Sequence, residues 1–556
     1  MTARVQSHPS TRVRGNPAHL PTHLPDRHPG DGRTQRAPAN LLSPADVRDS
    51  LDLARLLEQL GCGDDLIVVS NRAPCVHSHT DDGIVARRPA GGLVTALEAV
   101  LAAEGGCWIA HGSGDADRET TDEHGHVMKR HLDAPYRLRR LWLGDDEVAG
   151  YYDGLSNEGL WPLCHRTDVE PTFRTGDWEH YVRVNRRFAD AVVAEASSSR
   201  PVVLVQDYHL ALVPRMVREQ LPDAVIVLFW HIPFPAPERL ARLPWREQVM
   251  AGLLASTVVG LQTPADAANF KRARSACAPG LGTAHVDAYP ISIGWPARQD
   301  LPAPGLAIDV RRRFGVAPGV RLLVGVDRMD YTKGIPERLQ AFELLLEQRP
   351  ELLGQVTLLQ IGAPCRGALP AYQQIARQVK ALTDRINARF GNGAWQPVLL
   401  HAASANAATV TDCYRAADVC LVTSLHDGMN LVAKEFVAAR SDVRGALVLS
   451  RQAGAAAELD QALLVEPRDI AGIARAIGRA LDMPLQEQAA RMRAMRAVVS
   501  QNTVFGWAAR LLDDGLRIAA GRAADARGGK YAARVLAAGG AMAHGAAACP
   551  GISGRR

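Results

Sequence analysis

Residues 322–348, LLVGVDRMDYTKGIPERLQAFELLLEQ, contain the pattern that decides the fold. Leu322–Val326 is a short apolar run of the kind found in strands that are buried on both faces of a parallel sheet. A polar loop follows, and then a helical pattern over Pro336–Gln348, with Pro336 in the first turn, where proline is favoured. The segment therefore predicts one strand–loop–helix unit, the building block of a doubly wound α/β domain.

The same unit recurs along most of the chain. Seven more apolar runs predict buried parallel strands: Leu66–Val69, Val202–Val205, Val225–Phe229, Val258–Leu261, Val356–Ile361, Val419–Val422 and Ala446–Leu449. Four more segments have helical periodicity: Gly92–Ala103, Trp178–Ala196, Ala371–Phe390 and Asn430–Ala439. A single core rarely grows beyond about 250–300 residues. A chain of 556 residues therefore predicts two doubly wound α/β domains that face each other across a cleft, with the proline-rich stretch Pro296–Pro304 as their linker.

These patterns divide the chain into four segments. Residues 1–64 begin with a region rich in Pro, His and Arg and are expected to be largely disordered, apart from a short helix over Pro44–Leu60 with Ser43 as its N-cap. Residues 65–296 are expected to form the first Rossmann-like domain and residues 297–518 the second, whose last helix could cross back to the first. Residues 519–556 are rich in Ala, Gly and Arg, and this low-complexity tail is expected to lack regular structure.

Composition and charge argue against several classes of protein. The chain has 64 Lys and Arg against 59 Asp and Glu, a net charge of only +5 with His neutral, and its basic residues are scattered, unlike the basic face of a nucleic-acid binder. Its nine Cys are odd in number and form no C-x-x-C pair, so neither a disulfide framework nor a zinc site is indicated. No apolar run approaches the roughly 20 residues of a membrane span. We expect a cytoplasmic protein that binds neither nucleic acid nor a membrane.

Several common nucleotide and hydrolase motifs are missing from the sequence. No G-x-G-x-x-G follows a predicted strand, and Gly61-Cys62-Gly63 precedes the first strand, which is the wrong side for a dinucleotide site. Walker A, H-E-x-x-H and G-x-S-x-G patterns are absent as well. A nucleotide-dependent oxidoreductase, a P-loop hydrolase and a serine hydrolase are therefore disfavoured.

Polar residues collect after the predicted strands, at the edge of a parallel sheet where ligands bind. Arg328 and Lys333 lie on one such loop, just before the helix that Pro336 opens. Two cations beside the positive end of a helix suit a diphosphate and would stabilise the charge of a leaving nucleotide. A surface loop of salt bridges fits the same residues equally well, so this segment alone leaves both interpretations open.

The strongest single indication of function is DGMNLVAKE at residues 427–435. Gly428 permits close approach of the backbone to a ligand, and free N–H groups at the start of the helix near Asn430 could hold sugar or phosphate oxygens. Asp427 could accept hydrogen bonds from sugar hydroxyls, and Glu435, two turns on, could bind a ribose. The alternatives are that Asp427 merely caps the helix and that Glu435 pairs with a surface cation.

Nine motifs follow one another along the chain: Ser70-Asn71-Arg72, Gly91-Gly92, Tyr151-Tyr152, Leu160-Trp161-Pro162, Asp207-Tyr208-His209-Leu210, His231-Ile232-Pro233-Phe234-Pro235, Arg328 to Gly334, Arg366, and Asp427 to Glu435. Taken together and in this order, they resemble the trehalose-6-phosphate synthase family, from about Leu66 to about Leu516. The resemblance implies the GT-B fold, two Rossmann-like domains around a cleft. It also implies a retaining transfer of glucose from a nucleoside-diphosphate glucose, with UDP-glucose the expected donor, to glucose 6-phosphate, giving α,α-trehalose 6-phosphate. No cofactor and no metal ion are expected.

The resemblance also assigns roles to individual residues. The residues expected to bind the donor are Gly92, His231, Arg328, Lys333, Asp427, Gly428, Met429, Asn430, Leu431 and Glu435. Within this set, Arg328 and Lys333 would hold the diphosphate and Glu435 the ribose. The residues expected to bind the acceptor are Arg72, Tyr152, Trp161, Asp207 and Arg366, with the arginines and the tyrosine hydroxyl on its phosphate. The residues expected to act in catalysis are Asp207, His231, Arg328 and Lys333.

Two features depart from the family pattern. His111, in the segment Trp108–Gly114, falls where the family often has a tryptophan near the acceptor, and the long terminal extensions are unmatched. Two alternatives therefore stay open: a glucosylglycerol-phosphate synthase, which uses glycerol 3-phosphate, and a catalytically silent sensing relative. The sequence does not choose the donor base among UDP, ADP and GDP, and it is compatible with a homo-oligomer.

Overall fold

A computed structural model describes residues 42–61, 65–87, 94, 97–101, 105–131, 134–296, 305–317 and 319–543. Four predictions lie wholly or mostly outside these residues: the disorder of residues 1–41, the donor-binding role of Gly92, the linker over Pro296–Pro304, and the lack of regular structure in residues 544–556 at the end of the tail.

In the described residues, the first sheet has eight strands in the order β10-β9-β8-β7-β1-β4-β6-β5. Their bounds are β1 (Leu66–Arg72), β4 (Cys107–His111), β5 (His126–His131), β6 (Ala134–Leu141), β7 (Val202–Gln206), β8 (Val225–Phe229), β9 (Val258–Leu261) and β10 (His285–Ala288). Neighbouring strands are parallel except for β5 and β6. The chain goes from β1 to β4 on one side and later returns to β7 on the other, so the strand order switches direction at β1. A separate hairpin consists of β2 (Val76–Thr80) and β3 (Gly83–Arg87).

The second sheet, as far as the described residues go, has six strands in the order β13-β12-β11-β14-β15-β16, and all its neighbouring strands are parallel. Their bounds are β11 (Arg321–Arg328), β12 (Val356–Ala363), β13 (Val398–His401), β14 (Val419–Val422), β15 (Ala446–Ser450) and β16 (Leu463–Val465). The strand order switches direction at β11. All eight predicted apolar runs are strands in one of the two sheets, so the predicted α/β fold with parallel sheets is confirmed.

Helices cover both faces of the second sheet. Those that follow its strands are α11 (Ile335–Gln348), α12 (Pro370–Phe390), α13 (Ala407–Ala416), α14 (Leu431–Ala439), α15 (Ile470–Asp482) and α16 (Leu485–Gln501). Neighbouring residues of β11 belong to different apolar clusters, because successive strand residues point to opposite faces. Leu323 packs in a cluster with residues of α11, α12 and α15, and Leu322 in a cluster with residues of α13, α14 and α16. The sheet is therefore doubly wound.

The helices around the first sheet are α1 (Ser50–Leu60), α3 (Asp145–Glu147), α4 (Trp161–Cys164), α5 (Thr175–Glu195), α6 (Val213–Gln220), α7 (Pro237–Leu240), α8 (Arg246–Leu254) and α9 (Pro264–Cys277), and α10 (Leu306–Phe314) precedes the second sheet. The predicted helix over Pro44–Leu60 is two pieces. Pro44–Asp46 is a 3-10 turn, and α1 begins only at Ser50. The N-cap of α1 is Asp49 and not Ser43, because the Asp49 carboxylate accepts hydrogen bonds from the first amides of the helix.

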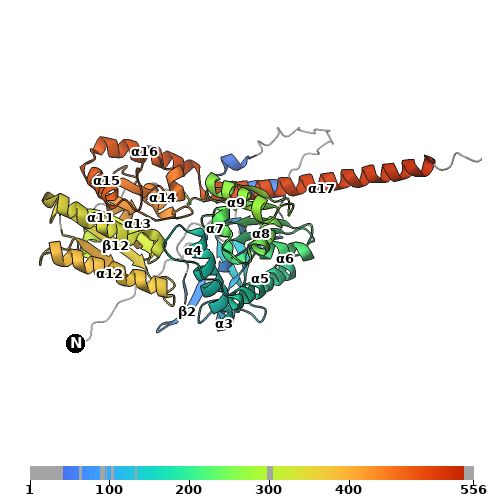
Figure 1. Cartoon of the computed structure of the whole chain (residues 1–556), viewed down its shortest axis with the longest axis horizontal. Coiled ribbons are helices and arrows are strands. Elements are labelled where there is room, and N and C mark those ends of the chain that lie inside the picture. Colours follow the sequence, from blue (N-terminus) through green and yellow to red (C-terminus); the bar gives the residue numbers. More distant parts are fainter. Residues whose placement is uncertain are drawn as a thin grey trace, which may run out of the picture. The chain divides into compact units, whose positions relative to one another are not determined.

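The last helix, α17, runs from Val504 to Ala543 and is the long red helix in Figure 1. Trp507 on α17 is fully buried and packs edge-on against Phe229 of β8, with ring centroids 4.9 Å apart. The hydroxyl of Tyr289, just after β10, donates to Asp514 of α17 at 2.6 Å, so this helix packs on strands of the first sheet. The prediction that regular structure ends near Ala519 is wrong, since α17 continues through the alanine-rich segment. Alanine has the highest helix propensity.

Within the described residues, none of the helices combines the length and the apolar character that a membrane crossing requires.

Candidate active site

A cavity of about 350 Å³ is lined by residues that follow strands of both sheets. Arg72 is the last residue of β1 and Arg328 the last of β11, the two strands at which the strand order switches direction. Ligands of open parallel sheets bind at such points. Eight of the residues predicted from sequence line this cavity: Arg72, Tyr152, Trp161, Asp207, His231, Arg328, Arg366 and Asp427.

Tyr152 and Arg72 form a pair on one wall of the cavity. The Arg72 guanidinium donates to the Tyr152 hydroxyl at 3.1 Å, and the tyrosine ring stacks on His209 with centroids 5.6 Å apart. Tyr152 lies on a π-helix over Val148–Leu160, a rare element that is frequent at functional sites. Burial alone would raise the pKa of Tyr152, but the positive charges of Arg72 and Arg366 outweigh it and lower the pKa. This wall is therefore positively charged and suits an anionic group such as a phosphate.

Two arginines converge on the Trp161 ring. The guanidinium carbon of Arg366 lies 4.3 Å from the ring centroid and that of Arg328 lies 5.3 Å from it. Arg366 also donates to the hydroxyl of Tyr208 at 3.3 Å and to the hydroxyl of Tyr372. Its φ of +46° is in the left-handed region, which costs free energy for a residue other than glycine. The contacts of its guanidinium hold this conformation in place.

Asp207 is the second residue with a left-handed backbone at the cavity, with φ +74°. Its carboxylate accepts hydrogen bonds from the backbone amides of Tyr208 at 2.9 Å and His231 at 3.1 Å. Burial raises the pKa of Asp207 to about 6. Burial also lowers the pKa of His231 to about 3, and its Nε2 lies 2.9 Å from Oε1 of Gln206. At neutral pH, His231 is therefore a neutral hydrogen-bonding group and not a cation.

Lys333 and Asp427 form a buried ion pair beside the cavity. Nζ of Lys333 donates to Oδ2 of Asp427 at 2.5 Å, and Nδ2 of Asn430 donates to the same oxygen at 3.1 Å. Burial would raise the pKa of Asp427, but Lys333 outweighs it and lowers the pKa. Asp427 does not cap α14, whose N-cap residue is Asn430, so the capping alternative is wrong. Lys333 is only 8% exposed, which contradicts the alternative of a loop of surface salt bridges for this residue.

The start of α14 lies close to the backbone of the other sheet. A Cβ atom on Gly428 would lie 2.2 Å from the carbonyl oxygen of His231, so only glycine fits at this position without a shift. The next residue, Met429, is buried, and Leu431 is the first residue of α14. The side chain of the N-cap residue, Asn430, makes no capping hydrogen bond in the described structure. Free amides at a helix start suit phosphate oxygens.

Glu435 lies further along α14 and is half-buried. Its carboxylate accepts a hydrogen bond from the Tyr414 hydroxyl at 3.3 Å, and burial raises its pKa. Its partner is thus a buried tyrosine and not a surface cation, as the alternative for this residue required. Of the predicted residues that the structure describes, six do not line the 350 Å³ cavity: Lys333, Gly428, Met429, Asn430, Leu431 and Glu435.

His111 ends β4 but is not among the residues that line the cavity. The cavity lining therefore gives no support to an effect of His111 on the choice of acceptor, which stays a prediction. Trp108 from the same strand lines the cavity, and its indole N–H donates to Ser70 at 2.8 Å. Burial lowers the pKa of His111.

Sequence reasoning gave no role to several residues of the site. They are Gln206, Tyr208, His209, Asp330 and Tyr372. Asp330 could have been noticed, because it is a carboxylate between two cations of one loop. The contact of Tyr208 with Arg366 joins residues 158 positions apart, so no local pattern indicates it. Tyr372 is only six positions from Arg366, but it carries no motif that points to a site.

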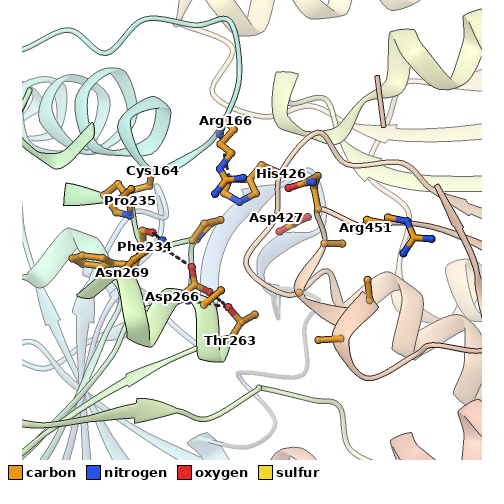
Figure 2. Close-up of a pocket in the computed structure, with 18 of the residues that line it drawn as sticks. Cys164, Arg166, Phe234, Pro235, Thr263, Asp266, Asn269, His426, Asp427 and Arg451 are labelled. Atoms are coloured by element: carbon orange, nitrogen blue, oxygen red, sulfur yellow. Dashed lines mark hydrogen bonds between the residues drawn. The ribbon is translucent and has the colours of Figure 1, made fainter. Parts of the chain in front are cut away.

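A second cavity of about 590 Å³ also touches Asp427. Figure 2 shows Asp266 and Asn269 on one side of it and Asp427 and Arg451 on the other. Asp427 is the one predicted site residue in its lining. Greater volume therefore does not identify the site, and the smaller cavity, where the predicted residues gather, is the candidate active site.

Metal ligands are not grouped in the part of the chain that the structure describes: no three His, Cys, Asp or Glu side chains there could hold one ion. The expected independence of metals and cofactors stays a prediction.

Comparisons with known proteins agree on one family. The sequence model of glycosyltransferase family 20 matches residues 64–516. The chain is 40% identical over 476 residues to a trehalose-6-phosphate synthase of Mycolicibacterium paratuberculosis, an alignment that covers 81% of this chain and 94% of that protein.

Two solved structures are similar along most of the chain. One is an E. coli protein bound with UDP-2-fluoro glucose, 32% identical with a TM-score of 0.71, covering 81% of this chain and 98% of that one. The other is a Burkholderia xenovorans UDP-forming α,α-trehalose-phosphate synthase in complex with glucose-6-phosphate, 34% identical with a TM-score of 0.70, covering 81% and 99%. These likenesses, with the two doubly wound sheets, confirm the predicted GT-B fold.

Proposed function

The chain belongs to glycosyltransferase family 20, and from this premise we propose that it transfers glucose from UDP-glucose to glucose 6-phosphate, forming α,α-trehalose 6-phosphate and UDP. One observation carries the proposal. Arg328 and Arg366 enter the same 350 Å³ cavity and pack on the same Trp161 ring. A reaction with a phosphate on each substrate needs two cationic sites that are close together, and these two guanidinium groups supply them.

The acceptor half of the cavity fits a sugar phosphate. Arg72, Tyr152 and Arg366 would bind its phosphate, since guanidinium groups form strong charge-assisted hydrogen bonds with phosphate oxygens. Trp161 would pack against the sugar ring. Asp207 would accept hydrogen bonds from the sugar hydroxyls while its backbone partners hold it in place.

The donor half includes Arg328, Lys333 and the start of α14. Arg328 and Lys333 would face the diphosphate, while Lys333 also fixes Asp427 for the glucose hydroxyls. The uncapped amides after Gly428 would bind phosphate oxygens. Glu435 would accept a hydrogen bond from the ribose, because its carboxylate has only a neutral hydroxyl as its hydrogen-bond partner in the described residues.

We propose that transfer proceeds with retention at the anomeric carbon. The bond from C1 of glucose to the UDP oxygen breaks as the acceptor hydroxyl adds to the same face, and the departing phosphate takes the hydroxyl proton. Negative charge grows on the leaving diphosphate, so cations beside it lower the barrier. Arg328 and Lys333 are the cations for that task. His231, neutral and held by Gln206, would donate or accept a hydrogen bond with the donor sugar.

Glycerol 3-phosphate as the acceptor is the alternative that His111 suggested. Because His111 does not line the cavity, the feature that favoured this acceptor is not at the site. A catalytically silent relative would be expected to lose donor-binding groups, but the Lys333–Asp427 pair is intact.

The test is a matrix of substrates. Purified protein is incubated with UDP-, ADP- or GDP-glucose against glucose 6-phosphate or glycerol 3-phosphate, and released nucleotide and product are measured. We expect the phosphorylated disaccharide, with UDP-glucose the best donor. If no donor yields that product, the proposal is wrong, and transfer to glycerol 3-phosphate alone would establish the alternative.

A cytoplasmic location is also part of the proposal. The seven described cysteines are all free thiols, which supports a reducing compartment.

A further inference from the structure

Asp330 lies between the donor arginine and the acceptor arginine. Its side chain is fully buried, and Oδ1 accepts hydrogen bonds from the amide and the hydroxyl of Thr332, both at 3.0 Å. Oδ2 has no hydrogen bond within the described structure. It lies 3.7 Å from Nη2 of Arg328 and 3.6 Å from Nη1 of Arg366. One carboxylate oxygen therefore faces both guanidinium groups.

The two guanidinium groups need such a partner. Both guanidinium groups pack on the ring of Trp161, 5.3 Å and 4.3 Å from its centroid. Two like charges held against one ring repel each other, and more strongly where water is excluded. Burial would raise the pKa of Asp330, but Arg328, Arg366 and Lys333 outweigh it and lower the pKa. Asp330 is thus ionised at neutral pH and supplies a negative charge between the two cations.

We infer that Asp330 is a positioning residue for the transfer: through one shared carboxylate oxygen it fixes Arg328 at the donor diphosphate and Arg366 at the acceptor phosphate. The inference rests on the proposed function. Asp330 is not among the described residues that line the 350 Å³ cavity, so it acts through the arginines. As an anion beside both phosphate sites, it also lowers the affinity for phosphates in the ground state. The advantage is in the transition state, because Asp330 holds both arginines in the positions that bind it, and catalysis requires stronger binding there than in the ground state.

A purely structural role makes a different prediction. If the task of Asp330 were only to fix the loop through Thr332, asparagine would replace it without loss, because the amide oxygen can accept the same two hydrogen bonds. Asp330→Asn keeps the size and the Oδ1 contacts and removes the charge. A matched control is Asp384→Asn on α12, where the carboxylate is 61% exposed and pairs with Lys380.

The first experiment compares kcat with UDP affinity in Asp330→Asn, Asp384→Asn and the wild-type protein. We expect kcat to fall about 100-fold in Asp330→Asn, since a shift of about 1 Å in a positioning group can cost that much. The dissociation constant of UDP, measured by calorimetry, should stay the same or decrease, because an opposing charge is gone. Wild-type kcat would overturn the inference, and so would a loss of UDP affinity as large as the loss of kcat.

The second experiment needs no activity. Asp330→Asn is placed in the wild-type protein and in the double variant Arg328→Gln, Arg366→Gln, and Tm is measured by calorimetry. In the wild-type background we expect Tm to fall, because two buried cations lose their shared anion. In the double variant we expect Tm to rise, because a buried carboxylate without its guanidinium partners is itself destabilising.

The same change of Tm in both backgrounds would overturn the inference. If the sign reverses but the wild-type protein transfers no glucose, only the proposed function fails. The two failures can therefore be told apart.

Discussion

Replacing Gly428 with alanine tests how closely the two sheets approach at the site. A Cβ atom on Gly428 would lie 2.2 Å from the carbonyl oxygen of His231 and 3.2 Å from Cα of Ile232. Ordinary contacts between non-bonded heavy atoms are at about 3.5–4.0 Å, so one backbone must move by at least about 1 Å. Gly428 does not have a positive φ, so the backbone conformation itself suits alanine and the effect is steric.

Either of the two segments could move. One carries Asp427 and the start of α14, and the other carries His231. A misplacement of about 1 Å in such a site can lower the rate about 100-fold. We therefore expect Gly428→Ala to lower kcat/KM for UDP-glucose by about that factor. Steady-state kinetics with saturating glucose 6-phosphate measures this change, and a Tm determination separates it from unfolding.

Gly393→Ala is the matched control, because a Cβ atom on Gly393 meets nothing within 4 Å. It should keep wild-type kinetics and Tm. Wild-type kinetics in Gly428→Ala would refute the close approach of the two segments and the donor role of this loop. A fall in Tm as large as that of a core substitution would mean that the glycine serves the fold and not the site.

Three further substitutions test individual roles. Lys333→Ala should lower kcat roughly 100-fold, as expected when one stabiliser of a leaving group is lost. The control is Lys380→Ala, because the Lys380 side chain is 70% exposed, and it should behave as wild type. If the two variants had the same kcat, the role of Lys333 would be excluded. Burial raises the pKa of Asp207 to about 6, so kcat/KM for the acceptor should fall as the pH drops below about 6 and the carboxylate is protonated. The acceptor phosphate itself titrates near pH ~6, so the contribution of Asp207 is the difference between the wild-type profile and that of Asp207→Asn; superimposable normalised profiles would contradict the assignment. Because the folded-state pKa is raised from 3.8, neutral Asp207 stabilises the fold at low pH, and this contribution is lost as the pH rises through about 6. Glu435→Gln should raise KM for UDP-glucose about tenfold, the effect of weakening one charge-assisted hydrogen bond, and leave KM for glucose 6-phosphate unchanged; a change in the acceptor KM alone would reverse the assignment.

The central strands were predictable from sequence because they are buried on both faces. Runs such as Val225–Phe229 are apolar at every position, the pattern typical of strands that are buried on both faces of a parallel sheet. Two of the strands that were not predicted lack it. β13 (Val398–His401) is an edge strand with half-exposed residues, and β6 (Ala134–Leu141) contains three arginines. An edge strand such as β13 buries less surface, so its sequence is less constrained. β6 lies between β4 and β5, and its apolar run is broken by arginines that pair with acidic residues, Arg139 with Glu195 and Arg140 with Asp117.

The candidate site was predictable as far as it depends on strand ends. Arg72 and Arg328 terminate the two strands where the order switches direction, and the position of such residues follows from topology. The resemblance to a known family supplied the other predicted residues, but it gave no role to Gln206, Tyr208, His209, Asp330 or Tyr372. Neither could show that Asp330 faces both arginines, because that contact depends on how two loops from different strands meet.

The pairing of Lys333 with Asp427 was likewise not predictable. The two residues are 94 positions apart. In the sequence, a loop of surface salt bridges was enough to explain Lys333, and a helix cap was enough to explain Asp427. Only the fold shows that the cation fixes the carboxylate beside the cavity. The tail after Ala519 is different, because two sequence signals there disagree. Its alanine content favours a helix, but it lacks the apolar stripe that usually marks a packed helix, so no helix was predicted.

The most direct measurement follows the labelled sugar from donor to product. UDP-[1-¹³C]glucose and glucose 6-phosphate are incubated with the protein, and the product is identified by ¹³C, ¹H and ³¹P NMR. We predict a non-reducing phosphorylated disaccharide in which the labelled carbon keeps the α configuration of the donor and is linked to an α anomeric carbon of the acceptor. A labelled carbon in the β configuration, a linkage to another acceptor position, or release of free glucose as the sole product would contradict the proposed reaction.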